Sequence, residues 1–132
     1  MITTAELQRI AEARIEDAEI LCRSGRYDGA IYLCGYAVEI ALKARICKTL
    51  TWKGYPSTRK EFQNYQTFKT HDLDVLLSLS NVESKVKTNL LAEWSAVATW
   101  DPEVRYKPIG SANKQDVEFM IESVKALLGV IL

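Results

Sequence analysis

The segment from residue 30 to residue 46 most constrains how this chain can fold. A helix formed by this segment would carry apolar side chains on almost every face, namely Ala30, Ile31, Leu33, Cys34, Ala37, Val38, Ile40, Ala41, Leu42, Ala44 and Ile46. Such a helix is buried, either in the centre of a bundle or in part against a partner chain. The sequence therefore predicts a central helix over residues 26–50.

One polar row interrupts this apolar helix. Tyr32, Tyr36, Glu39 and Lys43 follow one another at helical spacing and share one face. A structural interpretation makes Glu39 and Lys43 a helix pair, with the tyrosines contributing packing area. A functional interpretation makes the row a polar cluster at a dimer groove, which receives a ligand or a partner's arginine. Arg105 is a candidate partner for Glu39 in either case.

The N-terminal segment predicts a first long helix. Thr3 and Glu6 have the spacing of a capping box, and Gly25 suits the left-handed position that ends a helix. Between them, apolar residues recur at steps of three and four. The last long helix is predicted in the same way, because Asn113 and Asp116 precede an apolar stripe.

The middle of the chain predicts one short helix and one further long helix. Thr70 can cap a short helix from His71 to about Leu79, and Ser80 with Glu83 forms a second capping box. The long helix that follows carries an apolar face made of Val86, Leu90, Leu91, Trp94 and Ala98. No segment alternates cleanly enough to predict a strand. The expected fold is a single all-α domain over residues 1–132, an up-and-down bundle of four long helices plus one short helix.

Composition excludes several classes of protein. The net charge is zero, so no overall field attracts the chain to a polyanion. The three cysteines form no C-x-x-C pair, and no metal or cofactor motif is present. No apolar run approaches the roughly 20 residues that span a bilayer, and the N-terminus lacks a signal-peptide pattern. The chain is therefore expected to be cytoplasmic, with its cysteines buried as small apolar residues.

Charge is nevertheless concentrated in one segment. Residues 41–70 carry seven basic residues and a single acid, Glu61. Within this segment, the loop over residues 52–69 interleaves aromatic and basic side chains, which is typical of a platform for single-stranded RNA. The alternative is that the aromatic side chains fold back onto the bundle while the charges stay in water. The candidate RNA-binding residues are Trp52, Lys53, Tyr55, Arg59 and Lys60.

A second basic cluster precedes the last helix. Arg105, Tyr106 and Lys107 lie just before a predicted helix N-terminus, which favours anions. A phosphate of a nucleotide or of RNA would fit there. The structural alternative is an arginine that ties its loop to the bundle.

Several stretches together resemble the HEPN domain family. Residues 26–33 (RYDGAIYL) and 35–44 (GYAVEIALKA) are similar to the second helix of these domains. Residues 70–73 (THDL) resemble the start of the family's short third helix, and Trp94 with Arg105 and Tyr106 resembles the segment before its last helix. The resemblance implies a helical bundle that pairs as a symmetric dimer. It also implies one of two activities, metal-independent RNA cleavage or non-catalytic binding of nucleotides or RNA.

The sequence departs from the pattern of the RNA-cleaving members. Those members have an arginine followed a few residues later by a histidine, whereas the only histidine here is His71. The positions where that arginine would stand hold Asn64, Tyr65 and Gln66, and no histidine follows Arg105. Metal-free cleavage needs a group that exchanges protons near neutral pH, which is the role of histidine. His71 itself is interpreted as a solvated or capping residue.

The resemblance also implies a partner. Prokaryotic stand-alone members often pair with a minimal nucleotidyltransferase encoded beside them, in toxin–antitoxin arrangements. We therefore expect a non-catalytic homodimeric module that engages such a partner and binds a nucleotide through Tyr36, Glu39, Lys43, Arg105 and Tyr106. An RNA-binding protein or unconventional ribonuclease centred on Arg105 is the alternative. A third hypothesis is nucleotidylation by the partner, with Tyr106 as the first candidate.

Overall fold

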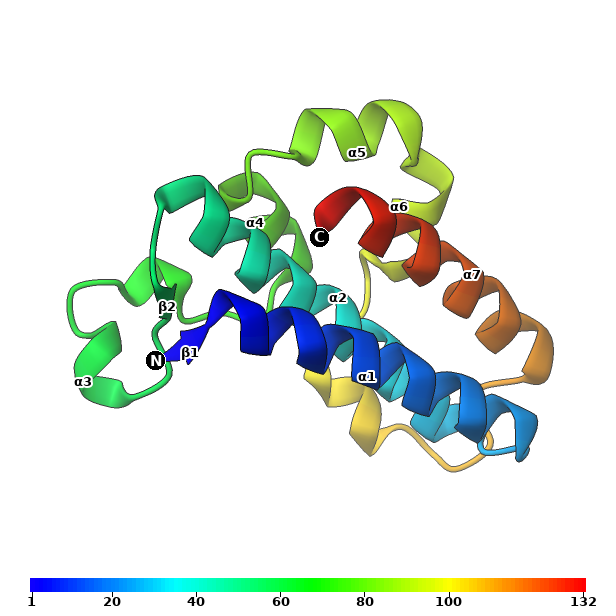
Figure 1. The fold of residues 1–132 in the computed structure, drawn as a ribbon. Coiled ribbons are helices and arrows are strands. Elements are labelled where there is room, and N and C mark those ends of the chain that lie inside the picture. The colour runs from blue at the N-terminus through cyan, green and yellow to red at the C-terminus, as the bar shows by residue number, and fades with distance from the viewer.

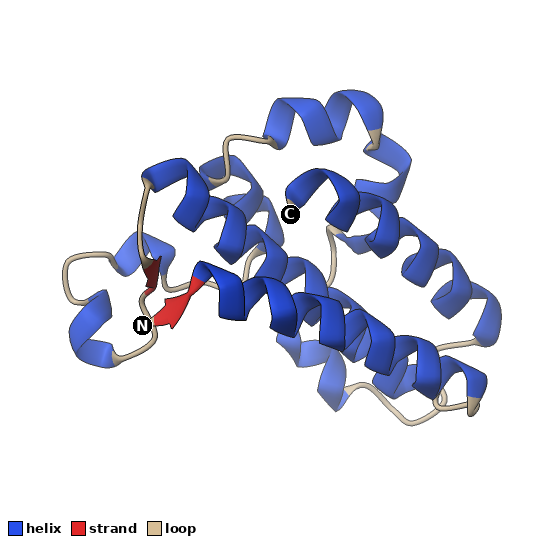
Figure 2. Ribbon diagram, in the orientation of Figure 1, coloured by secondary structure: helices blue, strands red, loops and turns tan.

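Three long helices form the frame of the protein in a computed structural model that describes all residues 1–132 (Figure 1). These helices are α1 (Thr4–Arg23), α2 (Tyr27–Leu50) and α7 (Lys114–Ile131). The other elements are short: α3 (Arg59–Phe62), α4 (Leu73–Leu79), α5 (Glu83–Asn89), α6 (Leu91–Val97), the 3-10 turns η1 (Gln66–Phe68) and η2 (Pro102–Tyr106), and strands β1 (Ile2–Thr3) and β2 (Gly54–Tyr55). The predicted all-α class is confirmed (Figure 2).

Helix α2 lies at the centre of the bundle. It contacts α1, α7, α4, η2 and β2, and Figure 1 shows α1 running alongside it. Its alanines at positions 30, 37, 41 and 44 are fully buried, as are Val38, Leu42 and Ile46. Most apolar residues of this helix are therefore buried against the chain's own helices, while Ile31, Leu33 and Ile40 stay half-buried.

A glycine brings Trp100 close to α2. A Cβ atom on Gly35 would overlap the indole ring of Trp100, so only glycine lets the ring lie against the helix backbone. The indole is 5% exposed and packs edge-on against Tyr36, with ring centroids 5.1 Å apart. Tyr32 packs in turn against Tyr36 at 5.0 Å. This aromatic cluster holds the segment after α6 against the first half of α2.

The predicted helix ends are confirmed for the long helices. The Thr3 hydroxyl accepts from the Glu6 amide at 3.2 Å, and the Glu6 carboxylate accepts from the Thr3 amide at 3.1 Å. Gly25, which follows α1, has a φ of +75°. At the start of α7, the Asn113 side chain accepts from the Asp116 amide at 2.8 Å. These motifs depend on neighbours in sequence, which is why the sequence predicts them.

The predicted fourth long helix is two short ones. The chain leaves helical geometry at Leu90 (φ −134°, ψ 39°), which separates α5 from α6. After this break, α6 contacts α7 and buries Trp94 and Val97, whereas Leu91 is exposed. A continuous helix would keep Leu91 on the apolar face that the sequence predicts. Packing against α7 instead selects the broken arrangement.

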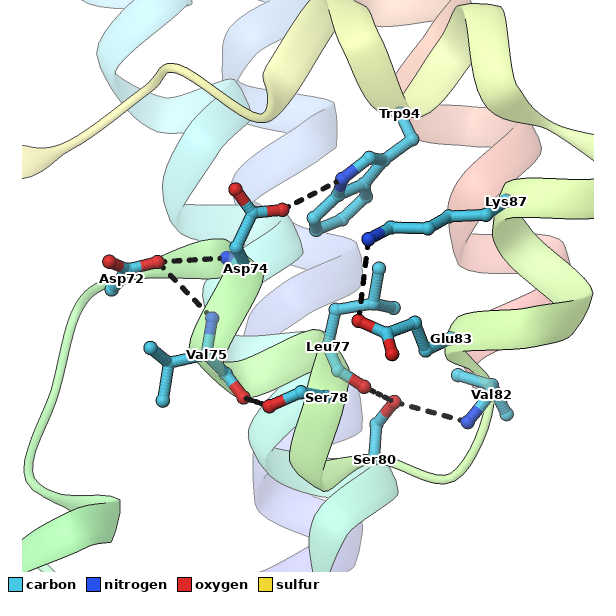
Figure 3. A network of polar contacts seen from close by, with 10 residues as sticks. All are labelled: Asp72, Asp74, Val75, Leu77, Ser78, Ser80, Val82, Glu83, Lys87 and Trp94. Carbon is cyan, nitrogen blue, oxygen red and sulfur yellow. Dashed lines mark hydrogen bonds and ion pairs between the residues drawn. The ribbon is translucent and has the colours of Figure 1, made fainter.

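The caps around α4 also differ from the prediction (Figure 3). The cap of α4 is Asp72, whose carboxylate accepts from the amides of Asp74 and Val75, while Thr70 accepts from the Asp72 amide. Ser80 forms no capping box with Glu83. Its buried hydroxyl donates to the carbonyl of Leu77 at 2.6 Å and accepts from the Val82 amide at 3.2 Å.

Helix α4 is tied to α6 by one polar contact. The Trp94 indole N–H donates to the Asp74 carboxylate at 3.1 Å, and Figure 3 shows the two side chains pointing toward each other. Because Trp94 is buried, its N–H needs such a partner. This contact joins the short helices on both sides of α5.

The loop over residues 52–69 contains more structure than the sequence predicts. Strand β2 pairs antiparallel with β1, with Ile2 opposite Tyr55 and Thr3 opposite Gly54. Helix α3 and turn η1 follow in the same segment. A pair of two-residue strands is too short to leave an alternating pattern in the sequence.

The cysteines lie as predicted. Cys22, Cys34 and Cys47 are free and buried, and burial raises the pKa of the Cys34 thiol to about 12. They therefore act as small apolar residues of the core. None of the helices combines the length and the apolar character needed to cross a membrane.

We predict opposite effects for two glycine substitutions in long helices. Gly35→Ala introduces a Cβ into the space of the Trp100 ring and should destabilise the fold by about 1–3 kcal/mol, as overpacking does. Gly129→Ala is the matched control, because no atom lies within 4 Å of its new Cβ. It should stabilise α7 by about 0.5–1 kcal/mol.

Urea unfolding of the three proteins measures both effects. A Gly35→Ala variant as stable as the parent would show that Trp100 does not lie against α2 as described.

Candidate functional site

The most buried charge of the chain is the carboxylate of Glu39 on α2. Its side chain is 3% exposed, and both of its oxygens have partners. Oε2 accepts from the Lys43 ammonium at 3.1 Å, and Oε1 lies 2.8 Å from Nδ1 of His71. The predicted pair with Lys43 is present. The other partner is His71, whereas Arg105, which the sequence suggested, lies elsewhere.

His71 reaches Glu39 because α4 packs against α2. The histidine stands just before the Asp72 cap, and its side chain is 59% exposed. An ionised carboxylate can only accept a hydrogen bond, so the proton of this contact lies on Nδ1. In the neutral ring, Nε2 is then left with a free lone pair. Sequence reasoning missed this contact because 32 positions separate the two residues.

Lys43 joins this cluster to strand β2. Its ammonium lies 5.3 Å from the centroid of the Tyr55 ring, over its face. Tyr55 is buried, and its hydroxyl donates to the carbonyl of Phe68 at 2.6 Å. Burial raises the pKa of Tyr55, so it stays a neutral phenol. We call Glu39, Lys43 and His71 the Glu39 cluster.

Arg105 belongs to a second group of polar residues, near the start of α2. Its guanidinium carbon lies 4.8 Å from the centroid of the Tyr106 ring. The neighbouring phenols of Tyr106 and Tyr32 raise the pKa of Arg105, which stays charged. Burial raises the pKa of Tyr36 to about 12. Of the five predicted ligand-binding residues, Glu39 and Lys43 pair on α2 and Arg105 lies over the Tyr106 ring of η2. The pKa of Tyr36 responds to the charges of both Glu39 and Arg105.

A groove of about 380 Å³ opens beside Arg105. It lies between the first half of α2, η2 and the start of α7, and Tyr32, Arg105 and Lys107 contribute to its walls. Two acids, Asp28 and Asp116, also line it. Arg105 and Lys107 are both exposed, so their charges are accessible from solvent. We call this feature the Arg105 groove.

Asp28 shapes one wall of the Arg105 groove. Its carboxylate accepts from the amide of Gly110 at 2.7 Å and from the amide of Ala112 at 2.9 Å. These two bonds fix the loop between η2 and α7, where Gly110 adopts a φ of +88°. They also lower the pKa of Asp28. The sequence contains Asp28 within the HEPN-like motif but gives no sign of a partner more than 80 positions away.

The predicted RNA-binding residues point in two directions. Trp52, Tyr55 and Phe68 pack against one another, with 4.9 Å between the ring centroids of Trp52 and Phe68. Because Tyr55 is buried, its ring offers no face to a base. The basic side chains, by contrast, are exposed at Lys53, Arg59 and Lys60. Tyr55 and Phe62 are thus buried as in the alternative in which aromatic side chains cover the bundle, whereas Trp52 is half-buried and Tyr65 is 45% exposed.

We predict that the loop beside the Arg105 groove opens at acidic pH. The two amide bonds depress the pKa of Asp28 below its unfolded value of about 3.9. A depressed carboxyl pKa stabilises the folded loop above the unfolded pKa, and this contribution is lost as the pH falls through the folded pKa. The amide protons of Gly110 and Ala112 should therefore shift together in an NMR titration, with a midpoint below about 3.9.

Asp28→Asn supplies the control for this titration. The variant has no carboxyl group at this position, so the shared midpoint should disappear from both amides. A midpoint above the unfolded value in the parent protein would contradict the described contacts.

Comparison with known proteins gives one match. The model of the family described as HEPN domain matches residues 4–60, which cover α1, α2, β2 and the start of α3. Neither the curated proteins nor the solved structures gave a match. Both Asp28 and the Glu39–Lys43 pair fall within the matched segment, while His71 and Arg105 lie beyond it. Residues 4–60 thus carry a HEPN domain pattern, and the resemblance predicted from the central helix is confirmed.

Proposed function

We propose that this chain is a non-catalytic HEPN-type module that binds a nucleotide phosphate in the Arg105 groove, pairs as a homodimer and engages a nucleotidyltransferase-type partner. The observation that carries the nucleotide proposal is the groove itself, where Arg105 and Lys107 lie with Tyr32 around about 380 Å³. A planar guanidinium binds phosphate oxygens in a bidentate manner, and lysine adds a second charge.

The acids of the groove leave room for an anion. Both oxygens of Asp28 already accept from loop amides, so this carboxylate is committed to the wall of the groove. Asp116 lies in the first turn of α7, where a negative charge is stabilised by the helix dipole. Arg105 and Lys107 thus share the groove with Asp28, which binds the loop amides, and Asp116, which lies in the first turn of α7.

The non-catalytic part of the proposal rests on the separation of the two polar groups. No hydrogen bond or ion pair joins His71 to Arg105, since His71 contacts Glu39 and Arg105 lies with Tyr32 and Tyr106. RNA cleavage without a metal needs a proton-transferring group beside the residue that binds the phosphate. The chain has no second histidine to fill that role.

Exposed apolar side chains support the partner proposals. Ile109 is fully exposed and Tyr106 is 70% exposed, and both lie in the segment that borders the Arg105 groove. A homodimer would use exposed apolar side chains such as Ile20 of α1 and Phe119 of α7, which are more exposed than the half-buried apolar residues of α2. Light scattering gives the mass of the complex and tests both proposals. The mass of the chain alone reports the homodimer, and the mass after co-expression with the product of an adjacent gene reports the nucleotidyltransferase-type partner.

RNA binding is the second candidate function, since three exposed cations remain in the loop after β2. Lys53, Arg59 and Lys60 contact no acid in an ion pair. Together with the Arg105 groove they would bind the phosphates of a single strand. The inward packing of the aromatic side chains gives this binding little base stacking, so it would depend on charge.

If the Arg105 groove binds a nucleotide, the affinity for that nucleotide depends on the Arg105 and Lys107 side chains. Titration calorimetry with ATP should give saturable binding, and Arg105→Gln or Lys107→Gln should each weaken it about tenfold or more, the value of one charge-assisted hydrogen bond. Lys85→Gln is the control, because Lys85 is exposed on α5 and takes part in no ion pair. Equal affinity in all four proteins, or no binding, would contradict the proposal.

A single-stranded RNA in the same titration separates the two candidate functions. In the alternative outcome RNA binds and ATP does not, with Lys53, Arg59 and Lys60 contacting the phosphates. A plot of the logarithm of RNA affinity against the logarithm of salt concentration should then have a slope of about −2. That outcome would replace the nucleotide proposal with the RNA-binding one.

A further inference from the structure

We propose that His71 is a phosphoryl acceptor, in which the Nε2 atom takes a phosphoryl group from a donor that carries it on nitrogen. The proposal concerns the Glu39 cluster, which the proposed nucleotide site does not use. It rests on one juxtaposition: an exposed imidazole held through Nδ1 by a buried, fully paired carboxylate.

The carboxylate fixes which nitrogen of His71 can react. Glu39 accepts from Nδ1 at 2.8 Å, so Nδ1 carries the proton and Nε2 carries the lone pair in the neutral ring. In a free imidazole the two tautomers exchange. A ring held in one tautomer by a carboxylate is a better oriented donor of electrons, as in the histidines that bind metals or take protons in enzymes.

The carboxylate itself is held in place. Its second oxygen accepts from the Lys43 ammonium at 3.1 Å, and Lys43 lies over the buried Tyr55 ring. Glu39 projects from the middle of α2 and is 3% exposed, among the buried residues of that helix. The geometry at His71 is therefore set before a donor arrives, which lowers the entropic cost of reaction.

The His71 side chain is open to solvent. It is 59% exposed while its carboxylate partner is 3% exposed, and the contact with Glu39 uses Nδ1 and leaves Nε2 without a partner in the protein. A donor therefore reaches His71 from the surface, without passing through a cavity. This exposure suits a small phosphoramidate or a phosphorylated side chain of another protein.

Two cations near His71 suit an incoming dianion. Lys69 is exposed two positions before His71. Asp72 is the adjacent acid, but its carboxylate caps α4 by accepting from two amides. Lys43 binds the second oxygen of the Glu39 carboxylate that His71 contacts.

The transfer step balances without a metal or a redox partner. The Nε2 lone pair forms a bond to phosphorus as the phosphorus–nitrogen bond of the donor breaks. With phosphoramidate, ammonia leaves with the electron pair of that bond and takes a proton from water. The modified ring keeps its proton on Nδ1 and gains a positive charge, which the neighbouring Glu39 carboxylate stabilises.

Phosphoramidate is the probe for this proposal. The intact protein is incubated with it, and one acid-labile phosphoryl addition is followed by mass spectrometry and phosphorus NMR. Because His71 is the only histidine, the product is assigned without ambiguity and should be absent in His71→Gln. The reaction should be about tenfold or more faster than that of a peptide spanning residues 69–74, the effect of one charge-assisted hydrogen bond.

The Glu39→Gln variant shows whether the Glu39 carboxylate speeds the reaction or whether the exposure of His71 alone explains the rate. The amide no longer stabilises the charged ring, so the rate should fall to that of the peptide. Where this variant fails to fold, the parent protein unfolded in urea replaces it, and its rate should fall to the same level. An equal rate in folded protein and peptide, or an unchanged rate in a folded Glu39→Gln variant, would overturn the proposal.

The outcome is independent of the nucleotide site. Lys85→Gln should leave the rate of phosphoryl transfer unchanged, because Lys85 is exposed on α5 and makes no contact with the Glu39 cluster. The test at His71 also uses no residue of the Arg105 groove. Failure of the nucleotide proposal would thus leave this test intact, and the reverse also holds.

Discussion

The fold is organised around the apolar helix α2, which needs neighbours along most of its surface. Helices α1, α7 and α4, turn η2 and strand β2 contact it and bury its central residues. A charge placed on such a helix must be paired, because an isolated buried carboxylate is costly. Glu39 is that charge, and its need for partners accounts for the positions of both Lys43 and His71.

The same helix also positions the second polar group. Tyr32 and Asp28 project from its first half, where Asp28 fixes the loop before α7 and Tyr32 lies beside Arg105. Because the packed helix cannot shift, the Arg105 groove and the Glu39 cluster are held at fixed places along one element. A single helix can in this way support two surfaces, one proposed to bind a phosphate and one proposed to accept a phosphoryl group.

The sequence predicts those features that neighbouring residues determine. The Thr3–Glu6 capping box, the left-handed Gly25 and the Glu39–Lys43 pair all depend on residues within one or two turns. Contacts between distant segments left no such pattern. The His71–Glu39 bond needs the packing of α4 on α2, the Asp28 bonds join segments more than 80 positions apart, and the break at Leu90 follows from packing of α6 on α7.

The tautomer of His71 shows whether the buried Glu39 carboxylate of α2 holds the exposed imidazole through Nδ1. Long-range proton–nitrogen NMR of the neutral ring distinguishes the two nitrogens. The account predicts a proton on Nδ1 and a bare Nε2 in the parent protein, with this preference lost in Glu39→Gln. A ring that carries its proton mainly on Nε2 in the parent protein would contradict it.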